Sequence, residues 1–190
     1  MIVFISGGVR SGKSSFAEQW AKTMAEAKYS LHYIATAMRT DEEMEARIAH
    51  HQQQRKRDRW QTWEQPYDLD HIISMFSKRD IVLLDCLTNL WANELFRDHI
   101  WDVHGKVPRI VQQMKQLADK AKGLIIVSNE VFYDGVPDER GTYMYMHGLG
   151  LLHQHLVTLS DVAILMRYGL PIVKKGRESC GEESFWLYSF

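Results

Sequence analysis

The residues best suited to chemistry form one short run near the N-terminus. Residues 7–14 match the phosphate-loop pattern G-x-x-x-x-G-K-[ST]. In order they are Gly7, Gly8, Val9, Arg10, Ser11, Gly12, Lys13 and Ser14. The apolar run 2–5 precedes them and a helical pattern follows, so backbone N–H groups and the positive end of a helix dipole would face one ligand. The pattern predicts binding of nucleotide phosphates; the alternative is an ordinary glycine-rich turn.

Two residues of this loop and one distant carboxylate have predicted roles. In a phosphate loop the lysine, here Lys13, reaches the β- and γ-phosphates, and the following hydroxyl, here Ser14, holds Mg²⁺. The metal usually has an acidic partner at the end of a nearby apolar strand, and Asp85 follows the apolar run 81–84. Asp85 is also placed to cap a helix that begins near Leu87. The two interpretations are compatible, and we expect the Mg²⁺ role.

A second polar pair follows another apolar run. Asn129 and Glu130 come just after residues 124–127, in a position analogous to that of Asp85. Such a pair either contacts substrate and orders water or simply caps a helix. The sequence favours neither interpretation.

Adjacent histidines lie in a basic segment. His50 and His51 belong to residues 47–55, which are rich in arginine and glutamine. Neighbouring residues of a helix point in different directions, so the pair is unsuited to chelating one metal ion. A neutral imidazole is nevertheless a competent nucleophile toward a nucleotide phosphorus at neutral pH. Spacing alone favours two solvated surface histidines.

Short apolar runs alternate with helical patterns along the chain. Expected strands cover residues 2–5, 32–35, 81–84, 124–127 and 162–166, and expected helices cover residues 15–27, 40–54, 87–98 and 108–120. Phe16, Trp20 and Met24 form an apolar stripe on the first helix, which we expect to be core. The alternation predicts a P-loop NTPase-like α/β fold, with a doubly wound, mostly parallel sheet and helices on both faces. Its ligands gather at the carboxyl ends of the strands.

Composition limits the classes of partner. The chain has 190 residues, a formal charge of −1 and two cysteines. We expect one catalytic domain over residues 1–176, with a tail of unknown role at 177–190. The near-neutral charge gives no reason to expect a nucleic acid or a membrane surface as partner. Two cysteines make no disulfide framework, and no leader or membrane span is visible, so we expect a cytoplasmic protein.

Several ordered motifs resemble one enzyme family. The phosphate loop is followed by Ala35-Thr36-Ala37, by His50-His51, by Trp60-x-Thr62-x-Glu64, by Asp85 within 84–90, and by Asn129-Glu130 within 127–131. Together they resemble the bifunctional adenosylcobinamide kinase/adenosylcobinamide-phosphate guanylyltransferase family. The resemblance covers residues 1–137 in the same order. That order is far more specific than the phosphate loop alone.

The resemblance implies two reactions of cobalamin biosynthesis. The first phosphorylates adenosylcobinamide with ATP or GTP, and the second transfers GMP from GTP to adenosylcobinamide phosphate through a guanylylated histidine, with Mg²⁺ as the metal. By motif position the nucleophile is His50. Nucleotide contacts carry over onto residues 7–14, onto Ala35, Thr36 and Ala37, onto His51, Gln52, Gln53 and Gln54, and onto Glu64 and Asp85. Family members form symmetric oligomers, so the resemblance also implies a homo-oligomer.

The chain departs from the family pattern after Pro137. Only Arg140, Gly150 and Gln154 match there, and 169–171 resembles the closing Gly-x-Pro of the family. These departures concern the acceptor side and the oligomer rather than the nucleotide. Two other functions remain open: a different small-molecule kinase without guanylyl transfer, and a nucleotide-dependent switch without catalysis.

Overall fold

The structure of the protein is a computed structural model that describes residues 1–26, 28–38, 59–133, 135 and 137–176. The expected helix at residues 40–54 and the tail at 177–190 lie outside the described residues. His50, His51, Gln52, Gln53 and Gln54 lie outside them as well.

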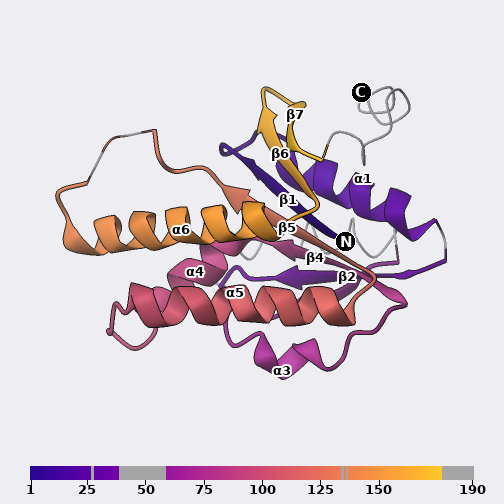
Figure 1. Cartoon of the computed structure of the whole chain (residues 1–190), viewed down its shortest axis with the longest axis horizontal. Coiled ribbons are helices and arrows are strands. Elements are labelled where there is room, and N and C mark those ends of the chain that lie inside the picture. Colours follow the sequence, from indigo (N-terminus) through magenta and orange to yellow (C-terminus); the bar gives the residue numbers. More distant parts are fainter. Residues whose placement is uncertain (27, 39–58, 134, 136, 177–190) are drawn as a thin grey trace.

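The centre of the fold is a seven-stranded sheet with the order β3-β2-β4-β5-β1-β6-β7 (Figure 1). The strands are β1 (Ile2–Gly7), β2 (Ser30–Ala35), β3 (Gln61–Glu64), β4 (Asp80–Asp85), β5 (Gly123–Asn129), β6 (Val162–Arg167) and β7 (Leu170–Lys175). Neighbours from β3 to β6 run parallel, and β7 is antiparallel to β6. The carboxyl ends of six strands therefore meet at one edge.

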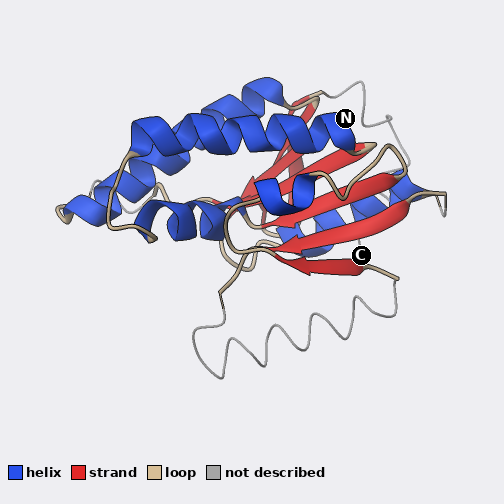
Figure 2. Cartoon of the chain, turned by 90° about the horizontal axis from the view of Figure 1, so that it is seen from below, coloured by secondary structure: helices blue, strands red, loops and turns tan. Residues whose placement is uncertain are grey.

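Helices cover both faces of this sheet, because successive residues of each central strand bury opposite faces. Val3 and Ile5 of β1 pack with α1 (Lys13–Ala25), whereas Phe4 packs into the cluster on the other face. That second face is covered by α3 (Asp70–Ile73), α4 (Leu87–Phe96), α5 (Val103–Lys120) and α6 (Arg140–Leu159) (Figures 1 and 2). The expected doubly wound architecture is confirmed.

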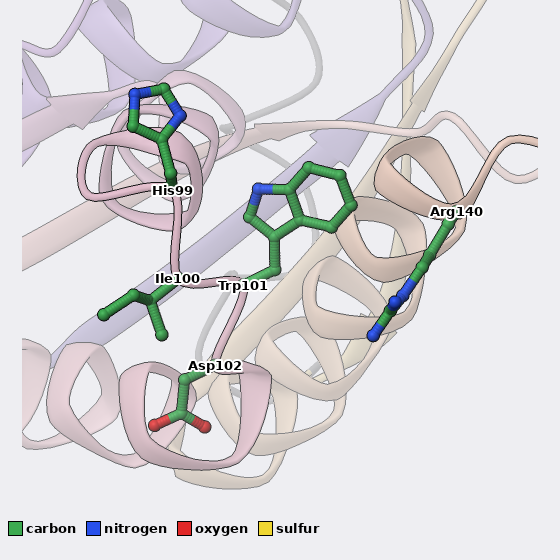
Figure 3. A pocket seen from close by; sticks show the side chains of 5 residues that line it. All are labelled: His99, Ile100, Trp101, Asp102 and Arg140. Carbon is green, nitrogen blue, oxygen red and sulfur yellow. The ribbon is translucent and has the colours of Figure 1, made fainter.

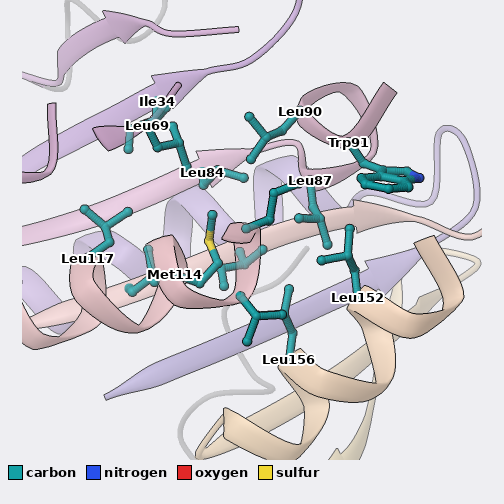
Figure 4. Close-up of a cluster of buried hydrophobic side chains, with 14 of the residues drawn as sticks. Ile34, Leu69, Leu84, Leu87, Leu90, Trp91, Met114, Leu117, Leu152 and Leu156 are labelled. Carbon is teal, nitrogen blue, oxygen red and sulfur yellow. The ribbon is translucent and has the colours of Figure 1, made fainter. Parts of the chain in front are cut away.

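The larger of the two cores lies between the sheet and helices α3 to α6. Leu84, Leu87 and Trp91 are completely buried in it, beside Met114 of α5 and Leu152 of α6 (Figure 4). The smaller core lies under α1, where Phe16 and Trp20 are buried and Met24 packs against them, as the apolar stripe predicts. Burial on both faces explains why the strands appear in the sequence as continuous apolar runs.

All five expected strands are present, and the two edge strands are the ones that the sequence did not reveal. β3 and β7 are mostly exposed, with burial on at most one side. Edge strands lack the continuous apolar run by which a central strand is recognised. The antiparallel β6–β7 pair also departs from simple strand and helix alternation.

Helix boundaries differ from the expectation where capping decides them. α5 begins at Val103 rather than near Pro108, because the Asp102 side chain accepts a hydrogen bond of 2.9 Å from the Gly105 N–H. α6 begins after Glu139, whose carboxylate accepts from the N–H groups of Gly141 and Thr142 at 2.7 and 2.6 Å. Such caps satisfy N–H groups that have no partner within the helix.

Helix α6 was not predicted from the sequence because it contains several glycines. A Cβ at Gly148 would lie 2.0 Å from Cζ2 of Trp91, so the helix carries glycine where the indole packs against its backbone. The Trp91 Nε1 donates to the carbonyl of Tyr145 at 2.8 Å. A tertiary contact thus determines a residue that local helix propensity disfavours. None of the helices in the described part of the chain is long and apolar enough to cross a membrane.

Candidate active site

The phosphate loop turns sharply between β1 and α1. Arg10 and Gly12 have φ values of 57° and 85°, and the N–H of Ser11 donates to the carbonyl of Gly8 at 3.2 Å. Positive φ is tolerated by glycine and costs other residues energy. The loop therefore has the strand, turn and helix context that its sequence pattern requires.

Gly7 is the tightest position of the loop. A Cβ there would lie 2.6 Å from the carbonyl oxygen of Met166 on β6 and 2.7 Å from Oγ of Ser11. By contrast, a Cβ at Gly8 would meet no atom of the described residues within 4 Å. The first glycine is required by close packing, and the second leaves its surroundings open for a ligand.

The N-terminus of α1 is prepared for an anion. Gly12 is the N-cap residue and supplies no side-chain acceptor, and the first turn contains no acidic residue. Within the described part of the chain, the N–H groups of that turn and the positive end of the helix dipole are thus not neutralised by the N-cap or by an acidic residue of the turn. Ser11 Oγ is buried and has no hydrogen-bond partner among the described residues. Phosphate oxygens are the acceptors that satisfy such donors.

Lys13 lies within the site rather than on the surface. It is 8% exposed, and its Nζ donates to the carbonyl of Gly8 at 3.0 Å. Burial lowers the pKa of its ammonium group, and the negative charge of Asp85 partly opposes that shift. Asp85 therefore acts electrostatically on the lysine from across the site, and an added phosphate would favour the charged ammonium further.

Asp85 ends β4, which is separated from β1 by β5. Its Oδ2 accepts a hydrogen bond of 2.8 Å from the hydroxyl of Tyr33 on β2. The N-cap of α4 is Cys86, and among the described residues no side-chain hydrogen bond caps this helix. The alternative that Asp85 caps the helix is therefore wrong, and its carboxylate is fixed by a neighbouring strand instead.

Thr36 explains how the backbone after Asp85 is fixed. Its side chain is completely buried; Oγ1 donates to the carbonyl of Cys86 at 2.7 Å and accepts from the Cys86 N–H at 2.8 Å. One hydroxyl group thus satisfies both the backbone N–H and the backbone carbonyl of Cys86. The Thr36 hydroxyl therefore fixes the backbone next to Asp85 through Cys86. Ala35 and Ala37 beside it are half-buried.

The pair at the end of β5 braces the phosphate loop. Asn129 pairs with Gly7, and the N–H of Glu130 donates to the Gly7 carbonyl at 3.0 Å. The carboxylate of Glu130 accepts from Ser6 and Tyr133 at 3.2 Å each. α6 begins at Arg140, so neither residue caps it. The helix-cap alternative is wrong for this pair.

The oxygens near the loop fit Mg²⁺. Ser14 is half-buried in the first turn of α1, and Asp85 supplies a carboxylate close enough to influence Lys13. A hydroxyl, one carboxylate and phosphate oxygens are the hard ligands that Mg²⁺ takes, with water completing its shell. Within the described residues no group of three or more His, Cys, Asp or Glu side chains is placed to hold a metal. A metal bound by Ser14 and Asp85 would therefore need phosphate oxygens or water to complete its coordination.

Glu64 is far from the loop. It ends β3 at one edge of the sheet, and four strand spacings, about 19 Å, separate that strand from β1. The structure brings residues 7–14, Asp85 and Glu130 together. Glu64 also lies at the carboxyl end of its strand, but that strand is the outermost one on its side of the sheet. A nucleotide that touches both the loop and Glu64 must lie along the edge.

Sequence reasoning missed a polar contact behind the site. The hydroxyl of Ser128 on β5 lies 2.7 Å from Nε2 of His153 on α6. Burial lowers the pKa of His153 to about 4, so its ring is neutral near pH 7. Phe4 and Phe132 pack edge-on against the imidazole. The contact joins α6 to the strand between the loop and Asp85, and no spacing in the sequence reveals it.

A cavity of about 390 Å³ lies away from these residues, between the α4–α5 connection and the start of α6. His99, Ile100, Trp101, Asp102 and Arg140 line it (Figure 3). Asp102 and Trp101 also have structural roles, since Asp102 caps α5 and the indole packs close to Gly141. Of the predicted catalytic and nucleotide-binding residues that the structure describes, none lines this cavity.

Comparison with known sequences identifies relatives over most of the chain. The model of the cobinamide kinase / cobinamide phosphate guanyltransferase family matches residues 3–174. The bifunctional adenosylcobalamin biosynthesis protein CobP of Pseudomonas aeruginosa is 34% identical over 173 residues, covering 90% of this chain and 96% of the relative. The protein CobU of Escherichia coli, with the same description, is 30% identical over 183 residues, covering 90% and 98%.

Comparison with solved structures supports the fold. The RadB recombinase superimposes with a TM-score of 0.53 at 13% sequence identity, covering 93% of this chain and 81% of that chain. The flagellar accessory protein FlaH from Methanocaldococcus jannaschii also has a TM-score of 0.53, at 15% identity, covering 96% and 81%. At these identities the similarity shows the P-loop NTPase-like architecture and nothing about substrates.

Proposed function

The chain belongs to the cobinamide kinase / cobinamide phosphate guanyltransferase family, and we propose that it catalyses both reactions. In the first, adenosylcobinamide is phosphorylated by ATP or GTP. In the second, GMP is transferred from GTP to adenosylcobinamide phosphate, which gives adenosylcobinamide-GDP. The observation that carries this proposal is the match over residues 3–174, which includes both the phosphate loop and Asp85.

The kinase step needs positioning and charge neutralisation rather than a covalent intermediate. The acceptor hydroxyl oxygen forms a bond to the γ-phosphorus, the bond to the β–γ bridging oxygen breaks, and the hydroxyl proton is lost to solvent. Lys13 and the N–H groups of residues 7–14 hold the charge that develops on the phosphate oxygens. Ser14 and Asp85 would hold Mg²⁺, which when bound neutralises phosphate charge.

The guanylyl step divides one difficult transfer into two easier ones. A ring nitrogen of His50 attacks the α-phosphorus of GTP, the bond to the α–β bridging oxygen breaks, and pyrophosphate leaves. A phosphate oxygen of the acceptor then attacks the same phosphorus, and the P–N bond breaks to restore the imidazole. Lys13 and the loop retain the pyrophosphate during the first half of this exchange. We further propose that residues 35–37, residues 51–54 and Glu64 contact the GTP of this second step.

Labelling with GTP tests the nucleophile. Protein incubated with Mg²⁺ and α-labelled GTP should acquire an acid-labile GMP adduct, and peptide mapping should place it on His50 rather than His51. The variant His50→Ala should carry no label, whereas His71→Ala, which changes an exposed histidine of α3, should be labelled like wild type. Full labelling of His50→Ala would show that the nucleophile is assigned wrongly. Transfer of γ-phosphate without any adduct would favour a kinase without the second activity.

Two properties of the protein as a whole complete the proposal. We propose that it acts in the cytoplasm, where its nucleotide substrates are found, and that it is a homo-oligomer. Light scattering on the purified protein tests the second statement, since a monomeric mass would contradict it.

A further inference from the structure

The hairpin between β6 and β7 has an unusual turn. Arg167 pairs with Leu170, so only Tyr168 and Gly169 form the loop, and their φ values are 53° and 80°. Two central residues with positive φ define the type I′ turn, which favours asparagine, aspartate or glycine at both positions. Gly169 fits this preference. Tyr168 does not, because its Cβ makes the left-handed conformation unfavourable.

Side-chain packing does little to offset the energetic cost of this backbone conformation at Tyr168. Its side chain is 93% exposed, the highest value among the large hydrophobic side chains on the described surface. A single exposed aromatic residue needs no explanation by itself. An exposed aromatic residue held in a disfavoured backbone conformation is different, because such strain is found preferentially at functional sites.

The turn lies beside the phosphate loop. β6 pairs with β1 so that Met166 is opposite Gly7. A Cβ on Gly12 would lie 3.8 Å from Cα of Gly169. The hairpin therefore stands next to the N-terminus of α1, as its place beside β1 in Figure 1 shows. Asp85 lies on the other side of the loop, because the sheet order is β4-β5-β1-β6-β7.

This arrangement indicates how a nucleoside triphosphate bound in the phosphate loop would be oriented relative to the sheet. Asp85 lies on the β4 side, and its charge acts on Lys13. The γ-phosphate and its metal would face that side, so the α-phosphate, ribose and base would extend toward β6 and β7. The base would then reach the turn next to Gly12, where Tyr168 is exposed.

We propose that the Tyr168 ring is a stacking surface for the purine base of the nucleotide that donates the γ-phosphate. The proposal rests on the proposed function, since it requires a nucleoside triphosphate in the phosphate loop. An aromatic ring stacks on any base, because every base presents a π-face. A platform of this kind accepts ATP and GTP alike.

Binding to matched variants tests the proposal. The ligands are the magnesium complexes of two non-hydrolysable triphosphates, AMP-PNP and GMP-PNP, and inorganic tripolyphosphate, which has no base. Tyr168→Asn should raise the Kd of at least one nucleotide by about tenfold, since base stacking has about that effect. The Kd of tripolyphosphate should not change. Tyr168→Phe should bind as wild type does, and Tyr143→Ala, on the exposed surface of α6, is the control.

Thermal unfolding separates this role from a structural one. Asparagine suits the first position of a type I′ turn better than tyrosine, so the Tm of Tyr168→Asn should equal or exceed that of wild type while its nucleotide affinity falls. Unchanged affinity of Tyr168→Asn for both nucleotides would overturn the stacking role and leave the proposed function standing. Failure of wild type to bind either nucleotide would overturn both.

Discussion

The phosphate loop and the region around Asp85 lie at the same sheet edge but are built differently. The loop consists of consecutive residues, and its conformation follows from two glycines and a local turn. Asp85 is instead held by Tyr33 and, through Cys86, by Thr36, which are 52 and 50 residues away from their partners in the chain. A ligand-binding motif can thus be local, whereas the carboxylate that serves it depends on contacts between strands.

The two regions also differ in how completely their polar groups are satisfied. Ser11 Oγ is buried without a partner among the described residues, and the N-cap of α1 has no side-chain hydrogen bond. Near Asp85, by contrast, the hydroxyls of Tyr33 and Thr36 both have short hydrogen bonds. The loop leaves donors for a ligand, and the other region uses its donors for rigidity. Replacing a ligand-facing group of the loop should therefore reduce mainly catalysis. Replacing a residue near Asp85 should reduce the stability of the fold as well.

The largest effect is expected in the loop itself. Lys13→Ala removes the ammonium group that faces the phosphates and should lower kcat of both transfers by about 1,000-fold, the upper effect of losing one preorganised donor. Transfer of label from γ-labelled and α-labelled GTP measures the two steps. Lys22→Ala, on the exposed side of the last turn of α1, is the matched control. A loss of less than tenfold would mean that the loop does not hold the reacting phosphates.

The next effect concerns β5, the strand between the two regions. His153 has a folded-state pKa near 4, below its ordinary value of 6.5. Between these two pKa values His153 is protonated in the unfolded chain and neutral in the folded protein. The free energy of unfolding should therefore fall as pH decreases from about 6.5 to 4. The contribution of this group is about 3 kcal/mol at most.

Urea unfolding of wild type and His153→Gln measures this dependence. The glutamine does not titrate, so the free energy of unfolding of the variant should fall less steeply over the same pH range. Parallel curves for the two proteins would contradict burial of a neutral His153.

The two glycines at the start of the loop provide a smaller and sharper comparison. Gly7→Ala puts a methyl group 2.6 Å from the carbonyl of Met166 and should cost about 1–3 kcal/mol of stability, as overpacking usually does. Gly8→Ala adds a methyl group with no described atom within 4 Å and should leave Tm nearly unchanged. Differential scanning calorimetry of both variants measures the two changes in Tm. Equal destabilisation would mean that packing against β6 does not determine the shape of the loop.

The smallest effect is expected from Tyr33→Phe, which removes the hydroxyl bound to Asp85. One hydrogen bond contributes about 1 kcal/mol, so the loss of stability should be of that size. Since Asp85 would then be less well oriented, the affinity for Mn²⁺ in the presence of AMP-PNP should fall about tenfold, as measured by electron paramagnetic resonance. Tyr29→Phe, just before β2, should change neither quantity. A loss of stability with unchanged metal affinity would contradict a positioning role.

Local patterns explain why much of the fold was predictable. The five central strands are continuous apolar runs, and the phosphate loop carries its own turn residues. β3, β7 and α6 were not predicted, since edge strands bury little and the α6 glycines follow the packing of Trp91. The role of Asp85 was expected from its strand, but its partner Tyr33 was not. His50, Gln52 and their neighbours lie outside the described residues and stay predictions.

The sequence by itself determined the phosphate loop, the mostly parallel α/β architecture and the family, because each depends on residues that are close in the chain or occur in a fixed order. Only the tertiary structure decided that Thr36 fixes the backbone next to Asp85, that Glu64 stands four strands from β1, and that Tyr168 stands beside Gly12. The physical reason is that strand order and side-chain burial set these distances. Neither can be obtained from spacing along the chain.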